Sequence, residues 1–212
     1  MENPVIIFGA NAIGREAKEI FEGNGNAVYC FLDDDKKLHN TEIDNITVMG
    51  STDDDGFLKL IGKKCEAFVA TDDNKLRKSL VKMLNEIRHV QPTNAVHKSS
   101  IIAASAGIGY GNFIDQGVKI GAGATIGQHC VIHAGVIIGM ECKIGDFVQI
   151  GPGSVISSGV VIEEEVFLGA GVTIVSGVTI EKGARIGVGS VVVRPVKAGE
   201  TLFGNPAQKV NS

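Results

Sequence analysis

A six-residue period in the second half of the chain constrains the fold more than any other feature. An aliphatic residue recurs without insertion at sixteen positions from 102 to 192, and all are Ile except Leu168 and Val192. An amphipathic strand has a period of about 2 and a helix about 3.6, so neither fits as one long element. The period predicts short strands, each followed by a tight turn, wound into stacked coils. Each strand turns one aliphatic side chain inward, and stacking buries what one coil cannot.

Glycine is concentrated in the same half. Many hexads have Gly directly after the aliphatic position, as at Gly139, Gly145 and Gly151. We expect these glycines to form corners, where the backbone angles disfavour a β-carbon. Residues 1–100 contain 7 glycines and residues 101–212 contain 21. This difference predicts two domains, residues 1–94 and 95–212.

The first hundred residues alternate between apolar strands and amphipathic helices. Strands are predicted at residues 5–8, 27–31 and 66–70, with helices after the first and the third. This alternation is typical of a small parallel sheet. The predicted fold class is therefore an α/β Rossmann-like domain followed by an all-β helix of coils.

Candidate binding residues lie in the turns after these strands, because parallel sheets bind ligands at the carboxyl ends of their strands. The turn at residues 9–14 opens a helix, and its N–H groups can cradle a phosphate; a purely structural turn is the alternative. Asn11 stands where the G-x-G-x-x-G pattern has its middle Gly. The acidic run 33–35 is either a ligand-binding turn or a solvated strand end, and residues 71–74 follow the third strand.

Charge and composition exclude several classes of protein. The formal net charge is −4, which argues against a nucleic-acid partner. No apolar run approaches the ~18 residues of a membrane span, and the start lacks a signal-peptide pattern. We therefore expect a cytoplasmic protein without membrane insertion. The four cysteines lack the spacing of a zinc site, so we expect reduced thiols and no metal.

The repeats and the closing segment 204–207 resemble the hexapeptide-repeat proteins. This resemblance implies a left-handed parallel β-helix with three strands per coil, in which residues 18 apart stack. Most members are trimeric acyltransferases that use acyl-CoA or acyl-carrier protein. With residues 31–34 and 71–77, nearly the whole chain is similar to bacterial sugar acetyltransferases of the sialic-acid O-acetyltransferase type. These include enzymes that N-acetylate UDP- or dTDP-linked 4-amino-deoxysugars.

The resemblance also implies a function and its residues. A homotrimer would transfer an acetyl group from acetyl-CoA to an amino (or hydroxyl) group of a nucleotide-linked sugar, in surface-glycan biosynthesis. Acetyl-CoA would lie between two β-helices, near Gln149, Ala170 and Val188. The N-terminal domain would bind the nucleotide sugar through its turns, with candidate residues Gly9, Ala10, Asn11, Asp33, Asp34, Asp73 and Asn74.

The chain departs from the family at the catalytic position. Met140 stands where the family has its general-base His, and a thioether has no useful proton affinity. Gln149 replaces a second family His, and Asp72 replaces a small Gly. His133 or Glu141 is the candidate base; both could instead be ordinary corner residues. The alternative function is therefore a non-catalytic trimeric paralogue that binds CoA or a nucleotide sugar, and a purely structural assembly module is a third reading.

Overall fold

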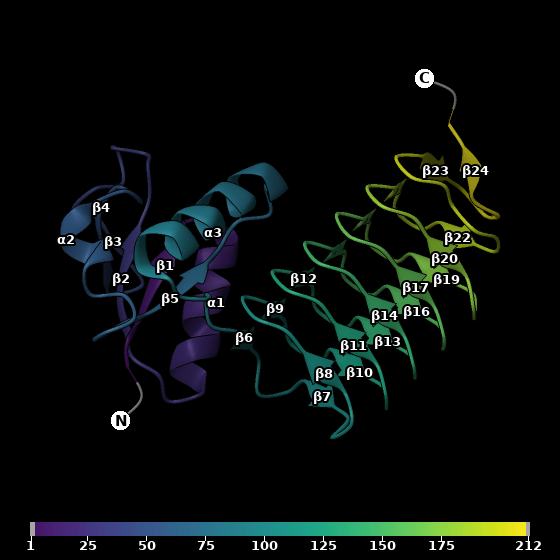
Figure 1. Cartoon of the computed structure of the whole chain (residues 1–212), viewed down its shortest axis with the longest axis horizontal. Coiled ribbons are helices and arrows are strands. Elements are labelled where there is room, and N and C mark those ends of the chain that lie inside the picture. The colour runs from purple at the N-terminus through teal and green to yellow at the C-terminus, as the bar shows by residue number, and fades with distance from the viewer. Residues whose placement is uncertain (1–2, 211–212) are drawn as a thin grey trace. The chain divides into compact units, whose positions relative to one another are not determined.

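The computed structural model describes residues 3–210, and the chain divides into two compact units, Met1–Lys98 and Ser99–Ser212 (Figure 1). The first unit is a five-stranded sheet in the order β3-β4-β2-β1-β5 with helices. All neighbouring strands pair in parallel except β3 with β4. Its elements are β1 (Val5–Phe8), α1 (Ala12–Gly23), β2 (Val28–Leu32), β3 (Glu42–Ile43), β4 (Ile46–Gly50), α2 (Asp55–Leu58), β5 (Glu66–Val69), α3 (Asn74–Arg88) and β6 (Ala95–Val96).

Two helices supply apolar side chains to the core of this unit. Leu80 and Leu84 of α3 are buried in one cluster with Ile6 and Cys30 of the sheet. From α1, the ring of Phe21 packs edge-on against that of Phe68 at 5.6 Å. The predicted α/β domain is confirmed. None of the helices in residues 3–210 combines the length and apolar character needed to cross a bilayer.

The prediction missed the segment between the second and third predicted strands. There β3 and β4 form a short hairpin, in which Asp44 and Asn45 both have positive φ (48° and 67°). Asp and Asn tolerate this conformation better than most residues, and such a pair favours a two-residue hairpin turn. The signal was present, but β3 has only two residues and shows no alternating pattern of its own.

The second unit is the predicted stack of coils. Its two-residue strands end at the predicted aliphatic positions, and strands 18 residues apart pair in parallel, for example Lys119↔Ile137 and Ile120↔Ile138. They form three sheets, β22-β19-β16-β13-β10-β7, β20-β17-β14-β11-β8 and one that includes β21-β18-β15-β12-β9. A parallel β-helix is therefore confirmed. The strands are β7 (Ile101–Ile102), β8 (Gly107–Ile108), β9 (Phe113–Ile114), β10 (Lys119–Ile120), β11 (Thr125–Ile126), β12 (Val131–Ile132), β13 (Ile137–Ile138), β14 (Lys143–Ile144), β15 (Gln149–Ile150), β16 (Val155–Ile156), β17 (Val161–Ile162), β18 (Phe167–Leu168), β19 (Thr173–Ile174), β20 (Thr179–Ile180), β21 (Arg185–Ile186), β22 (Val191–Val192), β23 (Thr201–Phe203) and β24 (Gln208–Lys209).

The reason for the glycines that directly follow many of the aliphatic positions differs from the expected one. Gly139 and Gly151 do not have positive φ. A β-carbon on Gly139 would instead stand 2.6 Å from the backbone nitrogen of Ser158 in the next coil. Positive φ occurs two residues later, as at Gly153 (68°) and even at Glu141 (58°). The glycine after the strand is thus required by close approach of successive coils, and the expectation about its backbone angle was wrong.

This distinction predicts unequal costs for two Gly→Ala changes. In Gly151→Ala the new β-carbon would lie 2.5 Å from the backbone nitrogen of Ala170, so stability should fall by about 3 kcal/mol or more through overpacking. Gly153→Ala meets nothing within 4 Å and should cost only the roughly 1–2 kcal/mol of a left-handed residue. Chemical denaturation at one fixed protein concentration measures both. Equal losses would contradict the packing explanation.

Candidate functional site

The carboxyl ends of the parallel strands enclose a small cavity of about 80 Å³, called here the inner cavity. Residues from β1, α3 and the turns after β1, β2, β4 and β5 line it. They are Phe8, Gly9, Asn11, Asp33, Asp34, Thr52, Thr71, Leu76 and Leu80. Four of the seven predicted substrate residues, Gly9, Asn11, Asp33 and Asp34, are therefore brought together at one place.

Hydrogen bonds connect the first turn to the strands beside it. The Ala10 N–H donates to Asp33 Oδ2 at 2.8 Å, and the Asn11 amide donates to the Ala70 carbonyl at 2.8 Å. Gly9 has φ 116°, and a β-carbon there would collide with the Ala70 carbonyl oxygen. Asn11 Oδ1 also caps α1 by accepting from the Gly14 N–H at 3.1 Å. The turn is thus held rigidly at the N-terminus of α1, where first-turn N–H groups lack intrahelical acceptors and favour an anion.

The turn after β4 is part of the site, and sequence reasoning missed it. Asp34 Oδ1 accepts from both the backbone N–H and the hydroxyl of Thr52, each at 2.9 Å. The available signal was the polar run Ser51 to Asp53, which follows an apolar stretch as the other ligand-side turns do. Because the hairpin strand was not predicted, the turn after it was not considered.

Asp73 and Asn74 do not line the inner cavity. Asp73 caps α3, because its Oδ1 accepts from the N–H groups of Lys75 and Leu76 at 2.8 and 3.0 Å. Asn74 Oδ1 accepts from the guanidinium of Arg77, which also donates to the Thr71 carbonyl. Arg77 is buried, so it holds the turn from within. Sequence reasoning assigned it no role; among these residues Thr71 is the one that reaches the cavity.

The candidate catalytic residues lie on two different corners of the β-helix. Met140 follows β13 and is 57% exposed. Glu141, with φ 58°, stands beside it. His133 follows β12, which belongs to another sheet, and its ring meets that of Phe113 at 6.1 Å. Within one chain, Glu141 shares the corner of Met140 and His133 does not.

The candidate residues for acetyl-CoA lie along the sheet that contains β12 and on the corner after it, where His133 also lies. Gln149 begins β15, and Ala170 follows β18, the next strand of the same sheet. Ala170 and Val188 stack in adjacent coils, because the Gly189 N–H donates to the Ala170 carbonyl at 2.8 Å. Val188 is 67% exposed. These three residues therefore lie on neighbouring coils along one sheet and the corner after it.

Neither a metal centre nor a reactive thiol is evident among the described residues. No group of three or more His, Cys, Asp or Glu side chains within residues 3–210 is placed to hold a metal ion. The four cysteines are buried. Burial raises the pKa of the Cys30 thiol to about 12, so it stays protonated at neutral pH.

Comparisons with known families agree with both units. Residues 4–84 match the PglD N-terminal domain. Residues 129–164 and 141–176 match the bacterial transferase hexapeptide (six repeats), and residues 159–194 match the hexapeptide repeat of succinyl-transferase. Fold and site together thus define an acyltransferase built on hexapeptide repeats. The chain thus combines a PglD-type N-terminal domain with bacterial transferase hexapeptide repeats.

Solved structures match the chain over its full length. The perosamine N-acetyltransferase PerB from Caulobacter crescentus, in complex with CoA and GDP-perosamine, is 28% identical, with a TM-score of 0.90. The match covers 100% of this chain and 99% of PerB. Two further structures of that enzyme carry His replaced by Asn or by Ala. A comparison with curated proteins found no match.

A more distant structure shares the fold. The acetyltransferase domain of PglB from Neisseria gonorrhoeae, in complex with acetyl coenzyme A, is 23% identical, with a TM-score of 0.89 and coverage of 99% of this chain and 100% of that domain. At this level of identity the likeness concerns the fold.

Proposed function

We propose that this protein is an acetyl-CoA-dependent acetyltransferase acting on an amino (or hydroxyl) group of a nucleotide-linked sugar, in surface-glycan biosynthesis. The observation that carries the proposal is the full-length match, at 28% identity, to an enzyme whose structure holds CoA and GDP-perosamine. The inner cavity supports it, because a rigid turn at a helix N-terminus suits a diphosphate. We further propose that the enzyme works in the cytoplasm, where acetyl-CoA is available.

The chemistry is acyl transfer from a thioester. The nitrogen of the sugar amine attacks the thioester carbonyl carbon, the C–S bond breaks, and the CoA thiolate leaves. The proton lost by the nitrogen ends on the CoA sulfur, so the products are an amide and free CoA. Holding both reactants together supplies the effective concentration, and N–H donors stabilise the oxyanion. Gln149, Ala170 and Val188 are the proposed CoA contacts.

The proton transfer lacks the usual base. Met140 has no proton affinity to offer, so Glu141 on the same corner is one candidate base. His133 is the other; it lies on a different corner from Met140, so only the His133 of a neighbouring subunit would reach the position of Met140. The missing histidine is the reason to test a second candidate function, a non-catalytic trimeric paralogue that binds CoA or a nucleotide sugar, although the full-length match to an enzyme favours the transferase.

A release assay separates the two functions. The full chain is first titrated calorimetrically with acetyl-CoA and with several nucleotide-linked amino sugars. Each pair that binds is then followed for free CoA thiol. Thiol release that depends on the sugar supports the transferase. Binding of both ligands without release would establish the non-catalytic alternative, and binding of neither would refute both.

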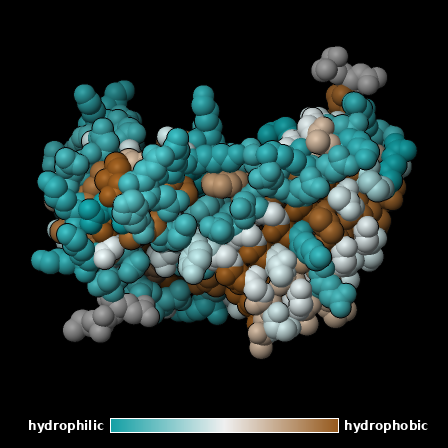
Figure 2. Space-filling model, viewed as in Figure 1, coloured by the Kyte–Doolittle hydropathy of each residue, from teal (hydrophilic) through white to brown (hydrophobic). Residues whose placement is uncertain are grey.

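A homotrimer is part of this proposal, since Met140 and Glu141 follow a strand of one sheet, whereas the proposed CoA contacts lie along another sheet of the same β-helix. The outward side chains of the sheet from β7 to β22 are largely apolar, with Ile101 65% and Ile137 39% exposed. Hydrophobic residues gather over the coils in the space-filling view (Figure 2). Covering such a surface with two further copies around a threefold axis would bury it. Sedimentation should give about three times the 22.2 kDa chain mass; a concentration-independent monomer would contradict the trimer.

A further inference from the structure

A second, larger hollow adjoins the inner cavity. This outer hollow has a volume of about 440 Å³ and shares Asp34 and Thr52 with the inner cavity. Its other lining residues are Lys36, His39, Ser51 and Asp53. With the diphosphate at the N-terminus of α1, the nucleoside of the same ligand would extend past Asp34 into the outer hollow. A volume of several hundred Å³ is typical of pockets that hold small molecules.

Hydrogen bonds inside the hollow fix its two carboxylates. Asp34 Oδ1 accepts hydrogen bonds from the N–H and the hydroxyl of Thr52, and Asp53 Oδ1 accepts from the Ser51 hydroxyl at 2.6 Å. Across residues 3–210, the second oxygen of each carboxylate accepts no hydrogen bond. Both side chains are therefore held by one oxygen and present the other to a ligand.

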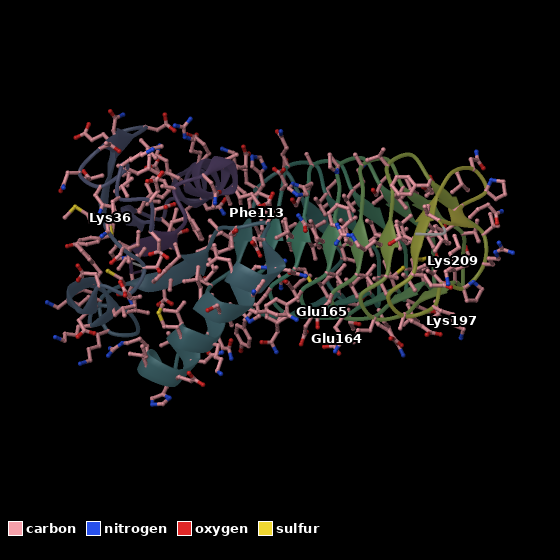
Figure 3. The ribbon with its side chains drawn as sticks, turned by 90° about the horizontal axis from the view of Figure 1, so that it is seen from above. Lys36, Phe113, Glu164, Glu165, Lys197 and Lys209 are labelled. Carbon is pink, nitrogen blue, oxygen red and sulfur yellow. The ribbon has the colours of Figure 1, made fainter. Side chains whose placement is uncertain are left out.

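The same hollow holds one cation and one imidazole. Lys36 lies on the surface of the N-terminal unit (Figure 3) and forms no ion pair in the part of the chain that the structure describes. His39 Nε2 is 2.7 Å from the carbonyl oxygen of Asp33, so this nitrogen carries the proton and Nδ1 is an acceptor in the neutral ring. The hollow thus offers mostly acceptors and a single strong donor.

This pattern distinguishes between nucleobases. Guanine presents N1–H and an N2 amino group as donors next to the O6 acceptor. Uracil and thymine present one N–H between two carbonyl oxygens. Two carboxylates would repel these carbonyl oxygens, because both groups are hydrogen-bond acceptors. Carboxylates accept from base amino groups, and Lys donates to guanine O6 or N7. We infer that the outer hollow binds guanine, with Asp34 and Asp53 accepting from N1–H and the N2 amino group and Lys36 donating to O6. The inference rests on the proposed function and names the nucleotide of its sugar substrate.

Calorimetric titration of the full chain with three nucleoside diphosphates tests the inference. GDP should bind about tenfold or more tightly than UDP, because a hydrogen bond to a charged group contributes enough for that ratio. Inosine diphosphate lacks the N2 amino group and should also bind about tenfold more weakly than GDP. In Asp53→Asn the affinity for GDP should fall to that for inosine diphosphate, while UDP binding is unchanged. Asp55→Asn, which changes another exposed acidic residue at the start of α2, is the matched control and should leave all three affinities unchanged.

The outcomes separate this inference from the proposed function. If UDP binds more tightly than GDP, or if Asp53→Asn weakens all three ligands equally, the guanine assignment is overturned and the nucleotide-sugar function stands. If no nucleoside diphosphate binds, both are overturned.

Discussion

Replacing Met140 with histidine should raise the rate of acetyl transfer by roughly 10²–10⁴, the usual contribution of general-base catalysis. Met140 is 57% exposed on its corner, so an imidazole there has room and contact with solvent. Glu141 stands next to it and offers a carboxylate that can orient the ring. The measurement is the turnover number in the thiol-release assay, at saturating acetyl-CoA and nucleotide sugar, from pH 5 to pH 9.

Met140→Gln is the matched control, because it adds polarity without a base and should leave turnover at the wild-type level. The Met140→His rate should also fall as the pH drops through about 6.5, where an ordinary imidazole becomes protonated and can no longer accept a proton. A vigorous wild-type enzyme that loses activity in His133→Ala would show that His133 is the base, and the prediction would then be wrong. Unchanged turnover in Met140→His, with both ligands bound, would also contradict it.

Replacing Ala170 with tryptophan should weaken acetyl-CoA binding by roughly 100-fold. Ala170 is only half-buried and stacks directly under Val188, so an indole would project over the surface assigned to the cofactor. Forcing extra volume into a fitted contact costs roughly 1–3 kcal/mol, and about 1.4 kcal/mol corresponds to a tenfold change in affinity. Isothermal titration with acetyl-CoA measures the change.

Ala198→Trp controls for the general effect of an added indole. Ala198 is exposed, and its N–H donates to the Glu181 carboxylate at 3.1 Å, outside the surface assigned to acetyl-CoA. This variant should keep wild-type affinity, and both variants should sediment like the wild type. Unchanged affinity in Ala170→Trp would move the cofactor site elsewhere on the β-helix.

The second unit could be predicted almost completely, because a strict period of six leaves one backbone arrangement that buries every aliphatic position. What the pattern could not reveal was the reason for Gly151. Its position next to a strand is compatible with either an unusual backbone angle or a close neighbour, and only the neighbouring coil decides between them. The same limit applies to Glu141, whose positive φ is not apparent from its residue type.

The first unit was predictable where strands are continuous and apolar. The general position of ligands on parallel sheets brought Gly9, Asn11 and Asp33 together correctly at one cavity. Asp73 shows the limit of this reasoning, because an Asp before a helix is equally typical of an N-cap, and it does cap α3. Ser51 to Asp53 were missed since their strand is part of a short hairpin. The roles of all these residues in binding stay predictions.

The uninterrupted hexads also limit how such a chain can change in length. Removal of 18 residues from within the repeat, such as 153–170, would leave each later side chain on its own sheet, one coil closer to the start of the stack. Removal of only six residues would keep every aliphatic side chain pointing inward. All later residues would nevertheless move onto a different one of the three sheets. Val188 would then no longer lie on the same side as Gln149. Only insertions or deletions of three hexads, one full coil, therefore keep every side chain on its own sheet. A shift of one hexad would preserve the fold but separate the residues assigned to acetyl-CoA.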